Sequence, residues 1–445
     1  MENKRKGLSA PGILTVLALV LLPILLGVFL MPGGGGSGAY NSYGGPVLPM
    51  TALSGGEHLE VTRNVDFDFS DYARERMNIL DTGMAVITDT YELTNTSGEE
   101  VTVELAYGFE GQFTDPAEQF PCITVGGNPA QTTLIASVDP EGALHRAKNW
   151  DTYKQVLTEE DFLTSALSPA LPGEFPVTAL RFSNVTYDQP EQEDVFHYGI
   201  QFTWPEDTDI WVRDYGMTTR DDKTKQHQLY FREDMGDGWM FVRGQLPEDI
   251  TYVGVSGYNI RENTILQDVT MEMEVSEADL YDCLWEFAQV FDFWAIHNGY
   301  DNPDVLTPEI LYGSALQFLK DPRYHNPSGD FQALSSVLYE AVTNVRMLYN
   351  TFSVTIPAGE SVTVEAVFTQ EPSTDIGGPR IPREGYDMAT TFGSCLNFTE
   401  QTASVTGSEY IEIVKQNFGF DLKKKLTQVV LDLSVERYFL DVAMK

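Results

Sequence analysis

The sequence predicts a mainly β protein with antiparallel, sandwich-like sheets, an α-helical insert and an N-terminal transmembrane helix. Most of the chain alternates apolar and polar residues with period two, which is typical of half-buried strands. Residues 276–346 show helical spacing instead. Residues 13–31 form a long uncharged apolar run. No alternation of strands with helices appears, so a parallel βαβ architecture is not expected.

The composition is that of a folded, strongly acidic protein. Of 445 residues, 42% are hydrophobic, which is enough to bury one or two ordinary cores. There are 66 Asp and Glu against 28 Lys and Arg, a net charge of −38. A phosphate backbone would be repelled by this charge, so nucleic acid is excluded as a partner.

The N-terminus predicts a membrane anchor. Three basic residues, Lys4–Lys6, precede the apolar run, which as a helix would span about 28 Å. We expect a single-pass cell-membrane protein whose N-terminus is cytoplasmic and whose C-terminal ectodomain is extracytoplasmic, with residues 13–31 in contact with the membrane. The alternative is a cleaved signal peptide, for which Ser37-Gly38-Ala39 could be the cleavage site. Residues 1–31 are therefore a cytoplasmic tail and anchor, or a signal peptide.

Residues 32–56 include nine glycines and predict a flexible linker, so the folded part is expected to begin near Glu57. Because residues 1–31 hold one acid and three bases, the remainder of the chain carries −40. The predicted role of this charge is solubility and repulsion from anionic surfaces.

Residues 57–275 predict a β-rich ectodomain. Leu59 to Ser70 alternates throughout, except that Arg63 occupies an apolar position. Residues 85–93 and 101–109 are predicted to pair as a hairpin through the turn at 94–98. Further strands are expected at 123–125, 132–137, 177–187, 196–204, 210–217, 228–231, 239–243 and 264–274. Two short helices near 151–167 are predicted, with Thr158 and Asp161 in capping-box positions for the second.

Residues 276–346 predict three successive helices. The first follows Ser276 and ends at Asn298-Gly299, the second runs from Thr307 to Asp321, and Asp330 begins the third. Residues 347–445 return to a β pattern. Residues 352–356 and 362–368 predict another hairpin, and strands at 410–414, 429–433 and 438–442 follow.

Two short segments resemble each other and two resemble known proteins. Gly98–Glu104 matches Gly359–Glu365, which indicates either a duplicated module or, as we favour, the common composition of such hairpins. Tyr91–Gly98, running into VTVELAYGF, resembles the opening of β-sandwich domains of the inter-alpha-trypsin-inhibitor N-terminal (VIT-like) type. FGSCLNFTEQTASV and YIEIVKQNFGFDL are similar to membrane-anchored ectodomains of uncharacterised Gram-positive bacterial proteins. Neither resemblance implies catalytic residues.

No catalytic, cofactor-binding or metal site is predicted, and no cofactor is expected. The His residues lack zinc-site spacing, the phosphate-loop and dinucleotide glycine patterns are absent, and so is G-x-S-x-G. The three cysteines, Cys122, Cys283 and Cys395, are far apart in apolar runs and predict buried free thiols. The sequence therefore favours a non-enzymatic protein, although it does not exclude an enzyme.

Two groups of residues are candidates for ligand binding. The first consists of acids that could bind Ca²⁺ but are more typical of solvated faces and turns: Asp66, Asp68, Asp71, Glu233, Asp234 and Asp237. The second consists of aromatic residues that could form a sugar platform but are more typical of a core: Trp204, Trp211, Tyr215, Tyr230, Trp239 and Phe241.

The functional prediction is a membrane-tethered extracytoplasmic protein that acts as a non-enzymatic binding or protein-interaction ectodomain. One alternative is an extracytoplasmic carbohydrate-binding or carbohydrate-active protein. The other is an assembly component of a cell-envelope membrane complex, whose helical insert would contact a partner.

Overall fold

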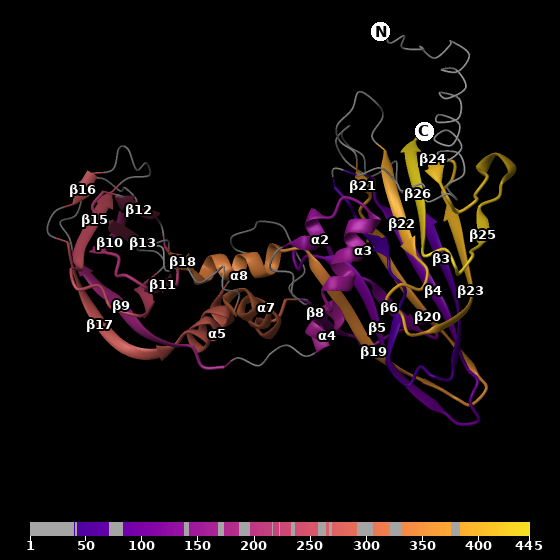
Figure 1. Cartoon of the computed structure of the whole chain (residues 1–445), viewed down its shortest axis with the longest axis horizontal. Helices are drawn as coiled ribbons and strands as arrows, with labels where there is room; N and C mark the ends of the chain where they lie inside the picture. The colour runs from indigo at the N-terminus through magenta and orange to yellow at the C-terminus, as the bar shows by residue number, and fades with distance from the viewer. Residues whose placement is uncertain are drawn as a thin grey trace, which may run out of the picture.

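The chain folds into two β lobes with three helices between them (Figure 1). The computed structural model describes residues 40, 42–70, 83–137, 142–167, 173–186, 196–215, 217–221, 223–232, 236–256, 264–266, 269–291, 306–320, 331–374 and 383–445. We call the lobe formed by residues 40–167 and 346–445 the proximal lobe, and the lobe formed by residues 173–279 together with the strand at 332–333 the distal lobe. The prediction of a mainly β protein with a helical insert is confirmed.

The proximal lobe is a sandwich of one wide sheet against two smaller ones. The wide sheet has the order β25-β23-β3-β4-β20-β6-β7, and the facing sheets have the orders β2-β5-β19-β8 and β1-β22-β26-β24, with β21 beside β22. A single apolar cluster with residues from all three sheets fills the space between them. The strands are β1 (Pro46–Val47), β2 (Thr51–Ser54), β3 (Leu59–Asp68), β4 (Ala85–Asn95), β5 (Val101–Gly111), β6 (Cys122–Val125), β7 (Asn128–Pro129), β8 (Thr133–Ala136), β19 (Arg346–Ile356), β20 (Ser361–Gln370), β21 (Ser373–Thr374), β22 (Glu384–Ala389), β23 (Asn397–Thr406), β24 (Ile411–Gln416), β25 (Gln428–Val430) and β26 (Arg437–Met444).

The two predicted hairpins of this lobe are wrong, although their strands are correctly located. β4 pairs with β3 and β20, whereas β5 pairs with β19 and β2, so the turn after β4 crosses from one sheet to the other. The turn between β19 and β20 crosses in the same way. Asn95 joins the two crossings, because its amide donates to the carbonyls of Glu99, Ile356 and Pro357. Period-two alternation identifies a buried face, but it does not identify the neighbouring strand.

Strand pairing also crosses the predicted domain boundaries. β3, β4 and β5 come from residues 57–275, and their partners β23, β20 and β19 come from residues 347–445. The chain leaves the proximal lobe after α4 (Phe162–Leu167) and returns at β19. The distal lobe and the helices are therefore inserted between two halves of one sandwich.

The folded part begins before Glu57, contrary to the expectation for residues 32–56. Tyr40, Tyr43, Val47 and Met50 are buried. β1 pairs with β22, and β2 pairs with β5. Glycine content predicted flexibility, but the aromatic and aliphatic residues between the glycines fill gaps at the edge of the sandwich. Residues 13–31 lie outside the described residues, and no helix within the described residues is long and apolar enough to cross a membrane.

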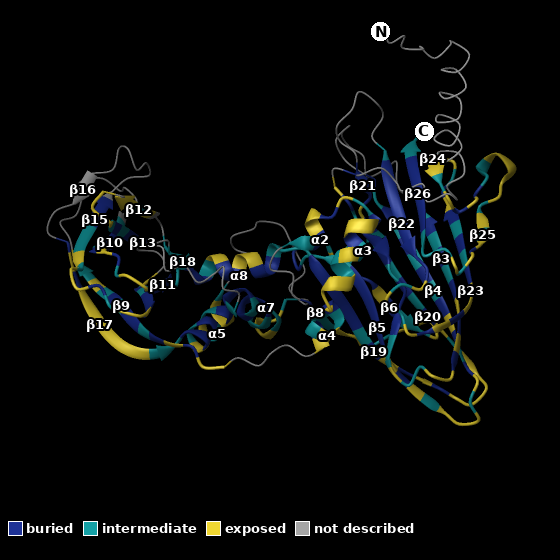
Figure 2. Ribbon diagram, viewed as in Figure 1, coloured by how far each residue is buried: buried dark blue, intermediate teal, exposed yellow. Residues whose placement is uncertain are grey.

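The distal lobe is a second sandwich. Its sheets have the orders β17-β9-β14-β11-β18 and β12-β13-β10-β15-β16, and they share a separate apolar core. Figure 2 shows that β17, at the edge of its sheet, is largely exposed. The strands are β9 (Pro176–Thr186), β10 (Phe196–Thr203), β11 (Asp209–Val212), β12 (Met217–Asp221), β13 (Gln226–Arg232), β14 (Gly238–Arg243), β15 (Thr251–Ser256), β16 (Thr264–Leu266), β17 (Thr270–Asp279) and β18 (Gln332–Ala333).

Three helices, α5 (Leu280–Val290), α7 (Pro308–Lys320) and α8 (Leu334–Thr343), form a core that reaches both lobes. This core includes Trp211 of the distal lobe and Leu348 of the proximal lobe. The predicted start of the first helix, Ser276, belongs to β17, and Asp279 caps the helix by accepting from the amides of Tyr281 and Asp282. The helices therefore connect the two sandwiches.

Three smaller helices, α2 (Ala143–Arg146), α3 (Trp150–Glu159) and α4, pack beside β5 and β19 (Figure 1). Two 3₁₀ helices, η1 (Ala117–Gln119) and η4 (Leu422–Lys424), lie elsewhere in the lobe. Asp161 accepts from the amide of Thr164, as expected for a cap of α4. The capping role of Thr158 is wrong, because its hydroxyl donates to the carbonyl of Lys154 inside α3.

Candidate functional site

The acidic residues proposed for calcium do not form a site in the described part of the chain. Asp66 accepts hydrogen bonds from the hydroxyls of Ser404 and Thr406, and Asp237 pairs with Arg181 at 2.6 Å. Asp71, Glu233 and Asp234 lie outside the described residues. No group of three or more His, Cys, Asp or Glu within the described residues is arranged to hold a metal ion.

Most of the aromatic residues proposed for sugar binding belong to the cores. Trp204, Trp211, Tyr230 and Phe241 are all buried. Tyr215 and Trp239 instead line a cavity of about 120 Å³ together with Asp214, Asp237 and Phe287. The set therefore divides into core residues and two residues at a small cavity between the distal lobe and α5.

The cysteines are free, as predicted, but none of them is fully buried, contrary to the prediction. Cys122 and Cys395 are exposed, and Cys283 is half-buried. Cys122 occupies an exposed position on β6, since an apolar sequence run does not decide which face a residue takes. Burial raises the pKa of the Cys283 thiol to about 11, with further increases from neighbouring acids.

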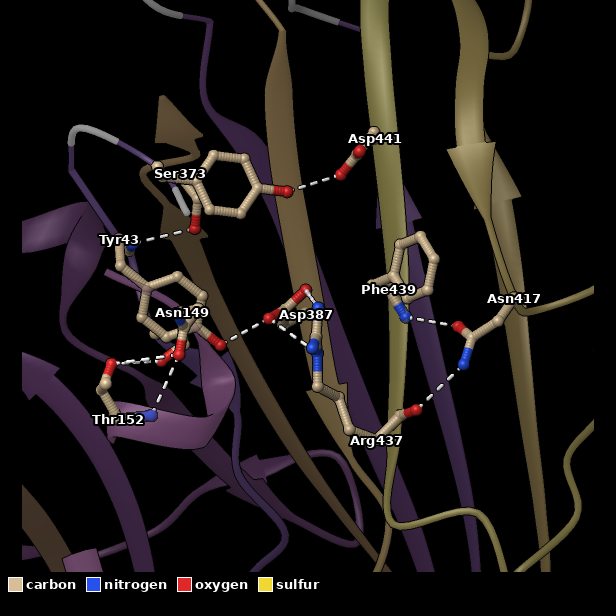
Figure 3. A network of polar contacts seen from close by, with 12 residues as sticks. Tyr43, Asn149, Thr152, Ser373, Asp387, Asn417, Arg437, Phe439 and Asp441 are labelled. Carbon is tan, nitrogen blue, oxygen red and sulfur yellow. Dashed lines mark hydrogen bonds and ion pairs between the residues drawn. The ribbon is translucent and has the colours of Figure 1, made fainter. Parts of the chain in front are cut away.

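The first residues of the described chain are held by a buried polar network, which Figure 3 shows. The hydroxyl of Tyr40 donates to Asp441 at 2.6 Å, and that of Tyr43 donates to Asp387. Arg437 contacts the same Asp387 carboxylate at 2.9 Å. Burial raises the pKa of Asp387, while Arg437 and Tyr43 oppose the shift. This network fastens the N-terminal segment to β22 and β26.

Beside this network lies a cleft of about 230 Å³, which we call the acidic cleft. Its walls are residues of the N-terminal segment 42–48, the end of β5 (108–112) and the end of β20 with the next two residues (368–372). Asp115 and His145 complete part of the lining. Three parts of the proximal lobe that are distant in sequence therefore meet at this point.

Three carboxyl groups line the acidic cleft: Glu110, Asp115 and Glu371. Burial raises the pKa of Asp115 to about 6; the Gln112 amide, which donates to Asp115, opposes the shift, and the Glu371 charge adds to it. Glu371 accepts from Gln119 at 3.3 Å. Among the described residues that line the cleft there is no Lys or Arg, so its electrostatic potential favours a cation.

Glu110 lies beneath the N-terminal segment. Gly45 has φ of +69°, and a Cβ at this position would stand 2.8 Å from Oε2 of Glu110. Burial, together with the Glu110 carboxylate, raises the pKa of the neighbouring Tyr153 well above its ordinary value. Glycine at position 45 therefore allows the segment to approach this carboxylate closely.

Two further oxygens at the cleft lack partners. Gln370 is 9% exposed, and its Nε2 donates to the carbonyl of Gly45 at 3.0 Å, which leaves its buried Oε1 without a hydrogen bond. The buried Oγ1 of Thr369 is also without a partner. Both residues line the acidic cleft. Buried polar atoms are normally satisfied, so these two oxygens are candidate acceptors for a donor from outside the chain.

A larger cavity, of about 490 Å³, lies near the start of α5 and also contains acids. Its Asp279 is already used, because the carboxylate caps α5 and accepts from the amide of Phe175 at 2.6 Å. This cavity has no comparable pair of unpartnered buried oxygens among its described residues.

Sequence reasoning did not identify the acidic cleft. Its three carboxyl groups are among 66 acids, so their presence alone carried no information. Gly44 and Gly45 approach the sandwich closely, but glycine content alone predicts a linker. No protein-family model matches the chain, and neither does any curated protein.

Proposed function

We propose that the chain is a membrane-tethered extracytoplasmic binding domain whose ligand enters the acidic cleft. The observation that carries the binding role is the combination, in one cleft, of three carboxyl groups and two buried oxygens without partners. The tether is supported by the apolar run at residues 13–31 and the basic residues before it. No catalytic step is part of the proposal.

The topology is tested by labelling cysteines in intact cells with a membrane-impermeant maleimide. Cys122 and Cys395 are exposed, whereas the raised pKa of Cys283 slows its reaction. We expect rapid labelling of the natural chain in intact cells and its loss in the double variant Cys122→Ser/Cys395→Ser. Labelling that requires cell lysis would contradict an extracytoplasmic location.

Binding at the cleft is tested with a panel of Nα-acetyl amino-acid methylamides whose side chains are cationic, neutral or anionic. Val47, Leu48 and Val345 line the cleft and provide methyl groups for NMR. We expect at least one member of the panel to shift these methyl resonances and to leave those of the exposed Val430 unchanged. If no member of the panel shifts them, the proposed binding role is wrong.

The carbohydrate alternative has one specific observation in its favour. Trp239 and Tyr215 line the cavity of the distal lobe with two carboxylates, an arrangement that suits a sugar ring. Trp239→Ala should then abolish glycan binding, while Trp285→Ala, which changes a tryptophan packed on Tyr312, should leave it unchanged. Equal binding by both variants would rule out this cavity. An assembly role for the helical insert stays a prediction.

A further inference from the structure

We propose that the acidic cleft recognises an alkylammonium group, such as a lysine side chain, by its charge and its N–H donors. This inference rests on the proposed binding function and adds the chemical class of the ligand. Hydrogen-bond acceptors outnumber donors among the side chains that line the cleft, and its walls are partly aromatic.

The charge balance selects a cation. Glu110, Asp115 and Glu371 line the cleft, and His145 is the titratable base among the described lining residues. An anionic ligand would meet like charges, and those of the half-buried Glu110 and Asp115 are screened less by salt than that of the exposed Glu371. A neutral ligand would bring no positive charge to Asp115 and Glu371, and no Lys or Arg among the described lining residues supplies one.

The hydrogen-bonding groups select a ligand rich in donors. Carboxylates only accept, and the orientation of Gln370 is set by the bond from its Nε2 to Gly45, so its Oε1 also accepts. The Thr369 hydroxyl adds another acceptor. An ammonium group has three N–H donors and no acceptor, which complements this set.

The walls and size of the cleft suit one aliphatic stem. Tyr43, Phe109 and Phe368 line it beside Val47 and Leu48, so methylene groups can contact apolar surface while aromatic faces attract the cation. Its volume of about 230 Å³ lies below the range typical of pockets for drug-sized ligands, which favours a single side chain.

A divalent metal fits these residues less well. Ca²⁺ requires about six to eight oxygens converging on one point. No such convergence of acidic side chains exists within the described residues, whereas an ammonium group on a flexible stem can contact spaced acceptors.

The test compares Nα-acetyl-lysine methylamide with its norleucine counterpart, which has a similar stem but no charge. Titration of the full chain at pH 7.5, followed through the cleft methyl groups, should give a dissociation constant in the millimolar range for lysine and binding at least tenfold weaker for norleucine. The double variant Asp115→Asn/Glu371→Gln should weaken lysine binding at least tenfold. Glu118→Gln, at an exposed acid of η1 outside the cleft lining, should leave it unchanged.

Thr369→Val provides a test that does not depend on charge. It removes an oxygen that has no partner in the protein, so the melting temperature should not fall, while lysine binding should weaken about threefold. Equal affinity for lysine and norleucine, or full lysine binding by the double variant, would overturn the inference. If a neutral or anionic amide binds the cleft and lysine does not, the ligand class is wrong while the binding function stands.

Discussion

Two groups of carboxyl side chains in the proximal lobe, one fully buried and one that lines a cleft, differ in how their charges are balanced. In the first, which we call the Arg63 cluster (Arg63, Asp89, Tyr91 and Tyr107), Arg63 donates to both oxygens of Asp89 at 2.9 and 2.8 Å, and both side chains are fully buried. The hydroxyls of Tyr91 and Tyr107 also donate to Asp89. In the acidic cleft, carboxyl groups face a cavity without Lys or Arg in its described lining.

The difference separates a structural role from a binding role. The Arg63 cluster satisfies its own charges, since Arg63 also donates to the carbonyl of Ala389 at 2.7 Å, so it needs nothing from outside. The acidic cleft retains an excess of acceptors that a ligand can satisfy. Changes in the cluster should therefore affect folding, and changes in the cleft should affect binding.

The largest effect is expected in the Arg63 cluster. Asp89→Asn leaves the charge of Arg63 buried without its counter-charge, which should lower the free energy of unfolding by about 3–5 kcal/mol. Urea denaturation measures this change. Glu92→Gln, on the exposed face of the same strand, is the matched control and should change stability by less than about 0.5 kcal/mol. If Asp89→Asn lowers the free energy of unfolding no more than Glu92→Gln does, the Arg63 cluster does not have the structural role that separates it from the acidic cleft.

A smaller effect is expected where the N-terminal segment is fastened. Tyr43→Phe removes one donor from the buried Asp387, while Arg437 still balances its charge, so we expect a loss of about 1–2 kcal/mol. Limited proteolysis should then cleave within residues 40–56 sooner than in the natural chain. Tyr410→Phe, at an exposed tyrosine, should not change the cleavage rate.

The pH dependence of cation binding should be smaller still. The Asp115 pKa of about 6 means that this carboxyl loses its charge as the pH falls through 6, so lysine affinity should drop several-fold between pH 7.5 and 5. Glu371, Glu110 and His145 line the same cleft. Calorimetric titration across this range should show a flatter profile for Asp115→Asn. If Asp115→Asn has the same pH profile of lysine affinity as the natural chain, Asp115 is not part of the binding site.

The positions of the strands could be predicted from the sequence better than the pairing of one strand with another. β3, β4, β5 and β20 lie within two residues of their predicted ends, because one face of each strand is apolar. The same alternation occurs in a hairpin and in a crossing between sheets, so the pairing of β4 with β20 was not visible. Arg63 interrupts the alternation at an apolar position, but its burial and its partner Asp89 are apparent only when the strands are paired.

The acidic cleft was hidden for a different reason. Its residues come from three distant parts of the chain, and its distinguishing feature is the absence of bonds at Thr369 and Gln370 rather than a motif. Unpartnered atoms exist only in the folded protein. Composition therefore indicated an excess of acids without indicating which of them face a cavity.

The most direct test of the contrast between the two sites is a pair of Asp→Asn substitutions measured by urea denaturation at pH 7.5. The folded-state pKa of Asp115 is raised to about 6, so the stability that it contributes at low pH is lost as the pH rises through 6. Asp115→Asn should therefore raise the free energy of unfolding, by an amount that shrinks as the pH is lowered toward 4. Asp89→Asn should lower it at the same pH. If both substitutions destabilise the protein, the acidic cleft is a structural cluster like the Arg63 cluster, and the proposed difference between the two sites is contradicted.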